Sequence, residues 1–264
     1  MTEYEKILLT REKTRPTARD YILNLITDFT ELHGDRRYGD DPALIGGIGF
    51  LDDMPVTVIG IEKGHDTGEK ISRNFGAVHP EGYRKALRLM RQAEKFHRPV
   101  LTIVDTAGAY CGIGAEKRGQ GEAIAENLME MMSLRTPVLS LFIGEGGSGG
   151  ALALAVADEI WMLSNAYYSV VSPESCANIL WKDPEKAGEA ASALKLSASD
   201  LRGFEVIERV IREPDGYSDG MAALKFYDRL LKEIRDRFRA LLAVDGDKLL
   251  EHRYERFRKI GRVE

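Results

Sequence analysis

The sequence predicts an α/β fold in which helices pack over a sheet. Apolar segments of strand length alternate with segments of helical period along the whole chain, which is the order typical of this fold class. The 264 residues are 44% hydrophobic and 30% charged, and this globular composition excludes intrinsic disorder as the main state. No internal repeat and no linker-like change in composition interrupts the pattern, so we expect a single domain over residues 1–264.

Two helices and three strands are expected before residue 105. The first helix carries apolar side chains at positions 22, 25, 26, 29 and 32, which share one helical face. The second helix follows Pro80, a residue that suits the first turn of a helix. The strands are runs rich in Val, Ile and Leu, and the first two flank a turn. In chain order the predicted elements are helix 19–33, strand 43–51, strand 56–61, helix 81–97 and strand 100–104.

Strands and helices keep alternating after residue 105. One predicted helix consists of small residues, and the last two helices have strongly charged outer faces. In chain order the predicted elements are helix 115–134, strand 138–143, helix 151–157, strands 159–163 and 168–171, helices 173–181 and 184–194, strand 206–211, and helices 221–242 and 247–259.

Charge, cysteine content and hydropathy exclude several classes of protein. The formal net charge is −5 and the isoelectric point about 5.7, which argues against a protein whose main task is to bind nucleic acid. The two cysteines, Cys111 and Cys176, are too few for a disulfide framework or a metal-ligand cluster. The charged N-terminus lacks an apolar targeting segment, and no run reaches the roughly 18 apolar residues of a membrane span. We therefore expect a soluble cytoplasmic protein that does not bind a membrane.

Glycine is concentrated in two loops that each follow an apolar strand and precede a helix. The chain has 26 glycines, and five of them fall among residues 144–150, while residues 105–114 form the other loop. Such turns leave backbone N–H groups unpaired, where they can hold an anion or a developing oxyanion. The density of glycine in the second loop favours this function over tight packing alone. The long polar stretch at residues 63–80 is a further candidate, because connections of that length are usually functional or mobile.

Nucleotide binding is a weaker explanation of these loops. Neither loop ends in the Lys-Ser or Lys-Thr of a phosphate-binding P-loop. The spacing Gly144-x-Gly146-x-x-Gly149 follows a strand, as in dinucleotide-binding folds. However, no acidic residue ends a following strand at the distance expected for a ribose ligand.

Catalysis by side chains has little support in the sequence. Ser148 lies in Gly-Gly-Ser-Gly-Gly, which resembles the nucleophile elbow of hydrolases, but only one histidine follows it, in a highly charged helix. Cys111 has no activating motif nearby. The histidines form no paired metal-binding pattern; they are His33, His65, His79, His97 and His252.

Four long blocks of sequence occur in a fixed order. The first begins at Lys63-Gly64 and continues through RNFG (73–76) to PEGYRKALRLM (80–90), and the second comprises DT (105–106), GAY (108–110) and GAEKRGQ (114–120). The third is IGEGGSGGALA (143–153), and the fourth comprises SPE (172–174), CA (176–177) and ILWK (179–182). In these blocks the chain resembles, from about residue 15 to near its C-terminus, the alpha subunits of bacterial acetyl-coenzyme A carboxylase carboxyltransferase.

The resemblance implies a crotonase (ClpP-like) fold, a ββα spiral with its core at about residues 40–212 and C-terminal helices at about residues 221–259. It also implies carboxyl transfer from carboxybiotin, carried on a biotin carboxyl carrier protein, to acetyl-CoA, giving malonyl-CoA for fatty acid synthesis. A beta subunit would join this chain in an α2β2 heterotetramer and would bring a zinc ribbon and the acyl-CoA oxyanion hole. Biotin carboxylase would complete the full complex, and this chain would hold no metal.

The resemblance also assigns roles to residues of this chain. The oxyanion hole for biotin would be the backbone N–H groups of Gly149 and Gly150, so no side-chain base need be conspicuous. Residues expected to line the biotin or acyl site are Gly146, Gly147, Gly108, Ala109, Tyr110, Gly112, Ile113 and Phe75. Basic residues expected to meet CoA phosphates are Lys63, Lys70, Arg73, Lys117 and Arg118.

The chain departs from the family pattern in places, and alternative functions stay open. Ala107 and Cys111 replace two family prolines, which should make this loop less rigid, and the N-terminal helical extension of many members is missing or very short. A carboxyltransferase for another acyl-CoA is one alternative. A stand-alone crotonase-type hydratase or isomerase is a second, with Glu116 and Glu145 as candidate acid–base groups. A non-catalytic scaffold subunit is a third.

Overall fold

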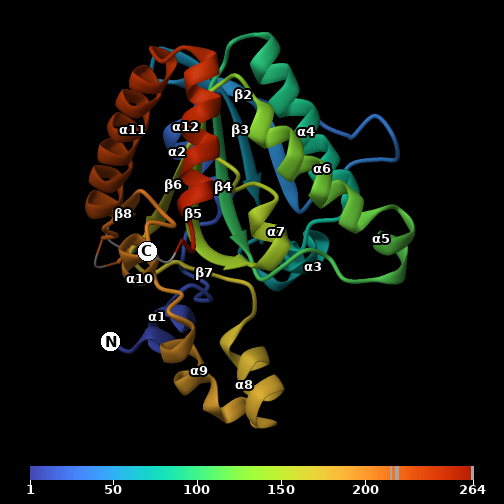
Figure 1. Ribbon diagram of the computed structural model, residues 1–264, viewed down its shortest axis with the longest axis vertical. Coiled ribbons are helices and arrows are strands. Elements are labelled where there is room, and N and C mark those ends of the chain that lie inside the picture. Colours follow the sequence, from blue (N-terminus) through green and yellow to red (C-terminus); the bar gives the residue numbers. More distant parts are fainter. Residues whose placement is uncertain (215, 218–219, 263–264) are drawn as a thin grey trace.

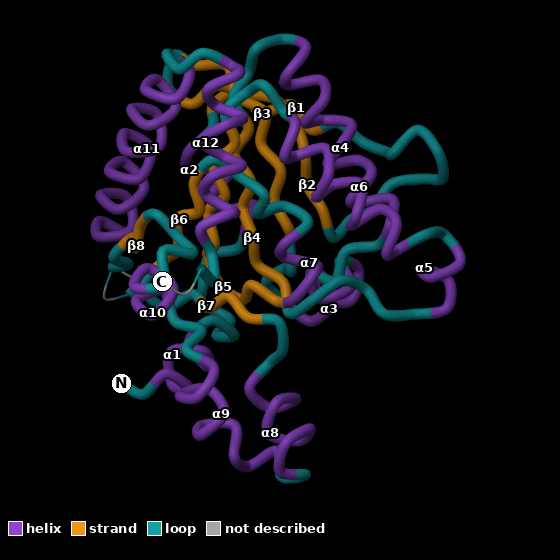
Figure 2. Tube along the Cα trace, viewed as in Figure 1, coloured by secondary structure: helices purple, strands orange, loops and turns teal. Residues whose placement is uncertain are grey.

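A mixed β-sheet runs through the middle of the molecule (Figures 1 and 2). In the residues that the computed structural model describes, 1–214, 216–217 and 220–262, the sheet has eight strands in the order β1-β2-β3-β4-β5-β6-β8, and β7 pairs with the end of β5. Strands β1 to β3 are antiparallel, whereas β3 to β8 pair in parallel. The strands are Thr27–Glu31 (β1), Leu44–Leu51 (β2), Met54–Ile61 (β3), Val100–Thr106 (β4), Val138–Gly147 (β5), Glu159–Leu163 (β6), Tyr167–Ser169 (β7) and Arg209–Ile211 (β8).

Helices surround this sheet, and a pair of them projects from one end with the N-terminal helix (Figure 1). The helices are Glu3–Leu9 (α1), Ala18–Leu25 (α2), Thr67–Ser72 (α3), Pro80–Lys95 (α4), Ile113–Lys117 (α5), Gln120–Ser133 (α6), Ser148–Leu152 (α7), Pro173–Trp181 (α8), Ala187–Leu194 (α9), Ala198–Gly203 (α10), Gly220–Leu242 (α11) and Gly246–Lys259 (α12), with 3₁₀ turns at Asn74–Gly76 (η1) and Pro184–Lys186 (η2). No helix in the described ranges combines the length and the apolar character needed to cross a membrane.

Both faces of the sheet are covered, and two glycines show which helix lies on which face. A Cβ added at Gly46 of β2 would lie 2.4 Å from Leu89 of α4, whereas one at Gly60 of β3 would lie 2.9 Å from Ala18 of α2. Gly46 pairs with Ile59, the neighbour of Gly60, and successive residues of a strand point to opposite faces. Helices α2 and α4 therefore lie on opposite faces, α2 beside α11 and α4 beside α6. Every residue of β4 and β5 is buried between these layers, as expected of parallel strands covered on both sides.

The predicted helix 19–33 is wrong in its second half. Helix α2 ends at Leu25, and β1 follows as an edge strand in which Thr27 pairs with Phe50 of β2. The β-branched residues Thr27 and Thr30 suit a strand. Pairing with β2 therefore stabilises a strand here, although the apolar residues have the spacing of a helix. The predicted helix 115–134 is two helices, because Gly119 has a φ of 81° between α5 and α6.

The boundary between the second glycine loop and the helix after it also differs from expectation. The predicted strand 138–143 continues to Gly147, and the helix begins at Ser148 and ends at Leu152 instead of covering residues 151–157. Strand 206–211 is shorter than predicted, because only residues 209–211 pair with β6. The polar stretch 63–80 contains α3 and η1, and helices α1 and α10 have no counterpart in the prediction. The single domain expected over residues 1–264 stays a prediction, and residues 215, 218–219 and 263–264 lie outside the described residues.

Candidate functional site

The two glycine loops meet at the carboxyl ends of β4 and β5. These strands are parallel neighbours, so the loops that follow them emerge at the same edge of the sheet. A Cβ added at Gly147 would lie 2.0 Å from the carbonyl oxygen of Ala107, and one at Gly150 would lie 2.5 Å from the amide nitrogen of Ala109. Both approaches are to backbone atoms, so only glycine allows the loops to lie this close.

Several unpaired backbone donors gather at this contact. Helix α7 begins at Ser148, so the N–H groups of Gly149 and Gly150 lie in its first turn and lack an intrahelical acceptor. Among the described residues, the N–H of Ala109 has no hydrogen-bond partner either. Tyr83 of α4 donates a buried hydrogen bond to the carbonyl oxygen of Gly150 at 3.2 Å, which holds the first turn of α7 against α4. The contact can therefore offer N–H donors from both loops to one negatively charged oxygen.

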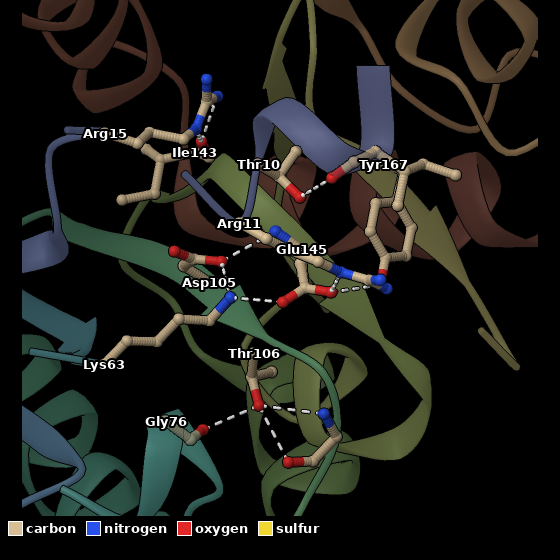
Figure 3. Close-up of polar contacts among 12 residues, drawn as sticks. Thr10, Arg11, Arg15, Lys63, Gly76, Asp105, Thr106, Ile143, Glu145 and Tyr167 are labelled. Atoms are coloured by element: carbon tan, nitrogen blue, oxygen red, sulfur yellow. Dashed lines mark hydrogen bonds and ion pairs between the residues drawn. The ribbon is translucent and has the colours of Figure 1, made fainter. Parts of the chain in front are cut away.

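The loop after β4 is held by Thr106 (Figure 3). The Thr106 hydroxyl accepts a hydrogen bond from the Gly108 N–H at 3.0 Å and contacts the carbonyl oxygens of Gly76 at 2.7 Å and Gly108 at 2.8 Å. Gly108 has a φ of 156°, which L-residues rarely adopt. The hydrogen bond from Thr106 to Gly76 also joins the turn η1 to this loop. Phe75 of that turn is 58% exposed and lines a pocket together with Ala107 of the loop.

The rest of this loop turns outward. Tyr110 donates its N–H to the carbonyl oxygen of Val78 at 3.1 Å, and its ring stacks on His79 with the centroids 4.0 Å apart. Gly112 caps α5, and Ile113, the first residue of that helix, is 77% exposed. Tyr110 is thus packed against protein, whereas Ile113 presents an apolar side chain to the outside.

A largely buried group of charges lies where the two loops begin (Figure 3). The Lys63 ammonium lies 2.7 Å from a carboxylate oxygen of Asp105 and 2.7 Å from one of Glu145. The other Glu145 oxygen accepts hydrogen bonds from Arg11 at 3.0 Å and from the Tyr167 hydroxyl at 2.8 Å. Asp105 also accepts the Glu145 N–H at 2.8 Å, which joins the ends of β4 and β5 where the loops begin.

Both Lys63 and Glu145 are charged in this arrangement. Burial alone would raise the pKa of Glu145, but the charges and hydrogen bonds of Lys63 and Arg11 hold it at about 2. Burial alone would lower the pKa of Lys63, but Asp105 and Glu145 keep it above its usual value. The Lys63 ammonium is therefore paired with two carboxylates, and its expected contact with a CoA phosphate stays a prediction.

The other expected basic residues are in three different situations. Lys70 lines a pocket of about 190 Å³ together with Lys63, Phe75 and Ala107. Arg73 donates to the carbonyl oxygen of Pro42 at 2.8 Å. Arg118 donates to both carboxylate oxygens of Glu81 and covers the ring of Tyr38, whereas Lys117 is exposed. Of the five, the structure brings only Lys63 and Lys70 to one pocket.

Other residues named from the sequence do not form the sites that were considered for them. Ser148 has a φ of 52°, a strained value at a sharp strand-to-helix turn. His252, the histidine that a hydrolase would need beside this serine, instead lines a separate groove with residues of α10 and α12. Gly146 is buried, and an added Cβ would meet the Phe142 ring at 2.5 Å. Within the described ranges, no group of three or more His, Cys, Asp or Glu side chains is placed to hold a metal ion.

The N-terminal segment contributes residues that the sequence patterns did not reveal. Arg11 bridges Glu145 and Glu174, and Arg15 donates to the carbonyl oxygen of Ile143 at 2.6 Å and pairs with Glu213. These arginines come from a charged stretch with no recognisable motif. Their partners are more than a hundred positions away, so no local signal identifies them.

Comparisons with known proteins find relatives that match almost the whole chain. The family model described as acetyl co-enzyme A carboxylase carboxyltransferase-like matches residues 1–261. The chain is 55% identical to the acetyl-coenzyme A carboxylase carboxyl transferase subunit alpha of Ruminiclostridium cellulolyticum, over 100% of this chain and 99% of that protein. It is 54% identical to the subunits beta/alpha protein of Natranaerobius thermophilus, over 99% of this chain and 43% of that protein.

Solved structures with this fold are more distant in sequence. The TM-score is 0.67 at 18% identity with a Pseudomonas malonate decarboxylase hetero-tetramer in complex with coenzyme A, over 88% of this chain and 90% of that one. It is 0.65 at 18% identity with the transcarboxylase 12S core that holds hydrolysed methylmalonyl-coenzyme A, over 80% of this chain and 42% of that one. At this identity the likeness is one of fold, and it confirms the predicted crotonase-like α/β fold.

Proposed function

The chain belongs to the family of acetyl-coenzyme A carboxylase carboxyltransferase alpha subunits, and from that premise we propose how it acts in the transfer of a carboxyl group between carboxybiotin and acetyl-CoA. The product of transfer to acetyl-CoA is malonyl-CoA, which supplies the two-carbon units that extend the chain in fatty acid synthesis. We further propose that residues 1–264 act as one carboxyltransferase domain.

The observation that carries the proposal is the meeting of unpaired N–H groups where the loops after β4 and β5 touch. When biotin gives up its carboxyl group, negative charge develops on the ureido oxygen. The N–H groups of Gly149 and Gly150, with that of Ala109 beside them, would stabilise this charge. Loss of one such donor typically costs about 3–4 kcal/mol of transition-state stabilisation.

We propose that the remaining residues named from the two glycine loops and η1 line the site around these donors. Gly108 and Gly147 allow the loops to approach, and Gly146 and Gly112 lie at the two ends of the loops. Phe75 and Ile113 are exposed apolar side chains, and we propose that they contact the biotin or the acyl group. Tyr110 would position its loop through His79 and Val78.

Acid–base chemistry of the hydratase type has less support. Glu145 is held ionised by Lys63 and Arg11, so it is a poor proton donor near neutral pH. Glu116 is exposed on α5. A carboxyltransferase for another acyl-CoA stays open as an alternative, because Ala107 and Cys111 lie in the loop that would line the acyl site.

We propose the following partners. Some relatives are beta/alpha proteins of a single chain, of which this chain matches 43–44%, and this supports a beta subunit as partner, in an α2β2 assembly. The zinc ribbon would belong to that subunit. Carboxybiotin would arrive on a carrier protein after its formation by biotin carboxylase, and the whole assembly would work in the cytoplasm.

The reaction can be tested in reverse. The chain would be co-expressed with a beta subunit and supplied with malonyl-CoA and free biotin, and we expect biotin-dependent decarboxylation that neither subunit shows alone. Hydration of an enoyl-CoA by the isolated chain would instead assign it to the hydratases.

A further inference from the structure

A groove outside the candidate site is rich in arginine. It has a volume of about 340 Å³ and lies between helices α4 and α6 and the loop that joins β1 to β2, which projects beside α4 in Figure 1. Two arginines come from the loop and three from successive turns of α4, where positions i, i+4 and i+7 share one face. These arginines are Arg36, Arg37, Arg84, Arg88 and Arg91.

Carboxylates neutralise only part of this charge. Arg84 donates to Asp35 at 2.7 Å. Arg91 lies 3.0 Å from Glu130 and 3.5 Å from Glu126. Arg37 reaches only Glu126, at 3.7 Å. Arg84 also lies 3.8 Å from Glu81, so three of the five arginines, Arg37, Arg84 and Arg91, form ion pairs.

Arg36 and Arg88 instead bind backbone carbonyl oxygens. Arg88 donates to the carbonyl oxygens of Gly34 at 3.0 Å and His33 at 3.3 Å, and Arg36 donates to that of His33 at 2.8 Å. Within the described part of the chain, neither guanidinium forms an ion pair with a carboxylate. Burial and the charge of Arg36 lower the pKa of Arg88, and the charges of Asp40 and Asp35 offset only part of this effect.

The geometry points to a ligand that carries phosphate. We propose that Arg36 and Arg88 bind the phosphate groups of a ligand in this groove, with Arg37 at its open side. The planar guanidinium fork matches two phosphate oxygens, and the volume lies at the lower end of the range of small-molecule sites. A dianion between Arg36 and Arg88 would remove the repulsion between them and supply the missing negative charge.

Helix α4, which carries Arg88, begins beside the candidate site, and this suggests a source for the phosphate. His79 stacks on Tyr110 of the first glycine loop and directly precedes α4. Arg88 lies nine residues further on, roughly 13 Å along the helix. A molecule that reaches from this groove toward the reacting groups needs a long arm with phosphates at its other end, which describes coenzyme A. This source rests on the proposed function, whereas a free phosphate or nucleotide requires only the groove.

Binding can be measured on the full chain in complex with a beta subunit, without turnover. Adenosine 3′,5′-bisphosphate and inorganic phosphate would be titrated by calorimetry into the wild-type complex and into Arg36→Gln, Arg88→Gln and Arg88→Lys variants. We expect the dissociation constant of the bisphosphate to rise at least tenfold in Arg36→Gln and Arg88→Gln, and less in Arg88→Lys, which keeps the charge but loses the fork. Arg98→Gln is the matched control, because Arg98 is also half-buried without a carboxylate partner but lies outside the groove.

The outcomes separate this inference from the proposed function. A tenfold rise in the KM for acetyl-CoA in Arg88→Gln, at unchanged kcat, would assign the site to coenzyme A. Loss of bisphosphate or phosphate binding with an unchanged KM would assign it to a free phosphate. Absence of binding to the wild-type complex, or equal weakening in the folded Arg98→Gln control, would overturn the inference even if carboxyl transfer is active. Conversely, if binding depends on Arg88 but the complex has no transferase activity, the phosphate site is supported and the proposed function is refuted.

Discussion

Substitution of Gly150 by alanine tests the contact between the two glycine loops. The new Cβ would lie 2.5 Å from the amide nitrogen of Ala109 and 2.7 Å from the carbonyl carbon of Gly108. Both are backbone atoms, so neither can rotate away, and the loops must separate by roughly 1 Å to restore an ordinary contact. A displacement of that size at a reacting centre typically costs about a hundredfold in rate. We therefore expect kcat to fall about a hundredfold in Gly150→Ala, while the protein still assembles.

Gly149→Ala is the matched control for this prediction. A Cβ at Gly149 would meet only the Ile124 side chain, at 3.8 Å, and the N–H donor stays in place. Alanine also favours a helix over glycine by about 1 kcal/mol, so stability should hold or rise. Biotin-dependent malonyl-CoA decarboxylation by each variant with the beta subunit, together with its melting temperature, provides the readout. Full activity in Gly150→Ala, or equal loss in both variants, would refute the argument from close approach.

Other predictions concern the buried charges. Glu145→Gln should lower the free energy of unfolding in urea at pH 7 by about 3–5 kcal/mol, because the largely buried Lys63 ammonium loses one of its two carboxylate partners; an unchanged midpoint would contradict this. The folded pKa of Glu145, about 2, lies below its ordinary 4.5, so its contribution of about 3 kcal/mol is present above pH 4.5 and lost as the pH falls toward 2. The stability difference between wild type and Glu145→Gln should therefore shrink over that interval, and a constant difference would speak against it. Arg253→Leu should cost about 3–5 kcal/mol by chemical denaturation, because it leaves Asp158 buried without its partner; a loss below 1 kcal/mol would show that the pair is not needed.

Much of the sheet can be predicted from local sequence. The strands β2 to β6 are runs of Val, Ile and Leu with clear turns around them, and α4 and α11 have regular apolar faces. Residues 27–31 cannot be assigned in this way, because their strand conformation depends on pairing with β2. The same holds for the end of β5, where Gly144 to Gly147 extend a strand that glycine itself does not favour.

The candidate site was predictable in its location but not in its contacts. The glycine content of residues 105–114 and 144–150 identifies both loops. The approach of Ala109 to Gly150 follows only from the parallel register of β4 and β5. Lys63 shows the converse, since a lysine in a polar loop suggests a ligand contact, whereas here Asp105 and Glu145 surround it. Arg11 reaches Glu145 across 134 positions, and no local pattern encodes such a contact.

The most direct test of the account is transfer of a labelled carboxyl group. Malonyl-CoA with a ¹³C carboxyl would be incubated with free biotin, this chain and a beta subunit, and the products followed by mass spectrometry. We predict label on biotin and unlabelled acetyl-CoA only when both subunits are present, with transfer reduced about a hundredfold by Gly150→Ala and retained in Gly149→Ala. Transfer by the beta subunit alone, or an intact complex that leaves malonyl-CoA unchanged, would contradict the account.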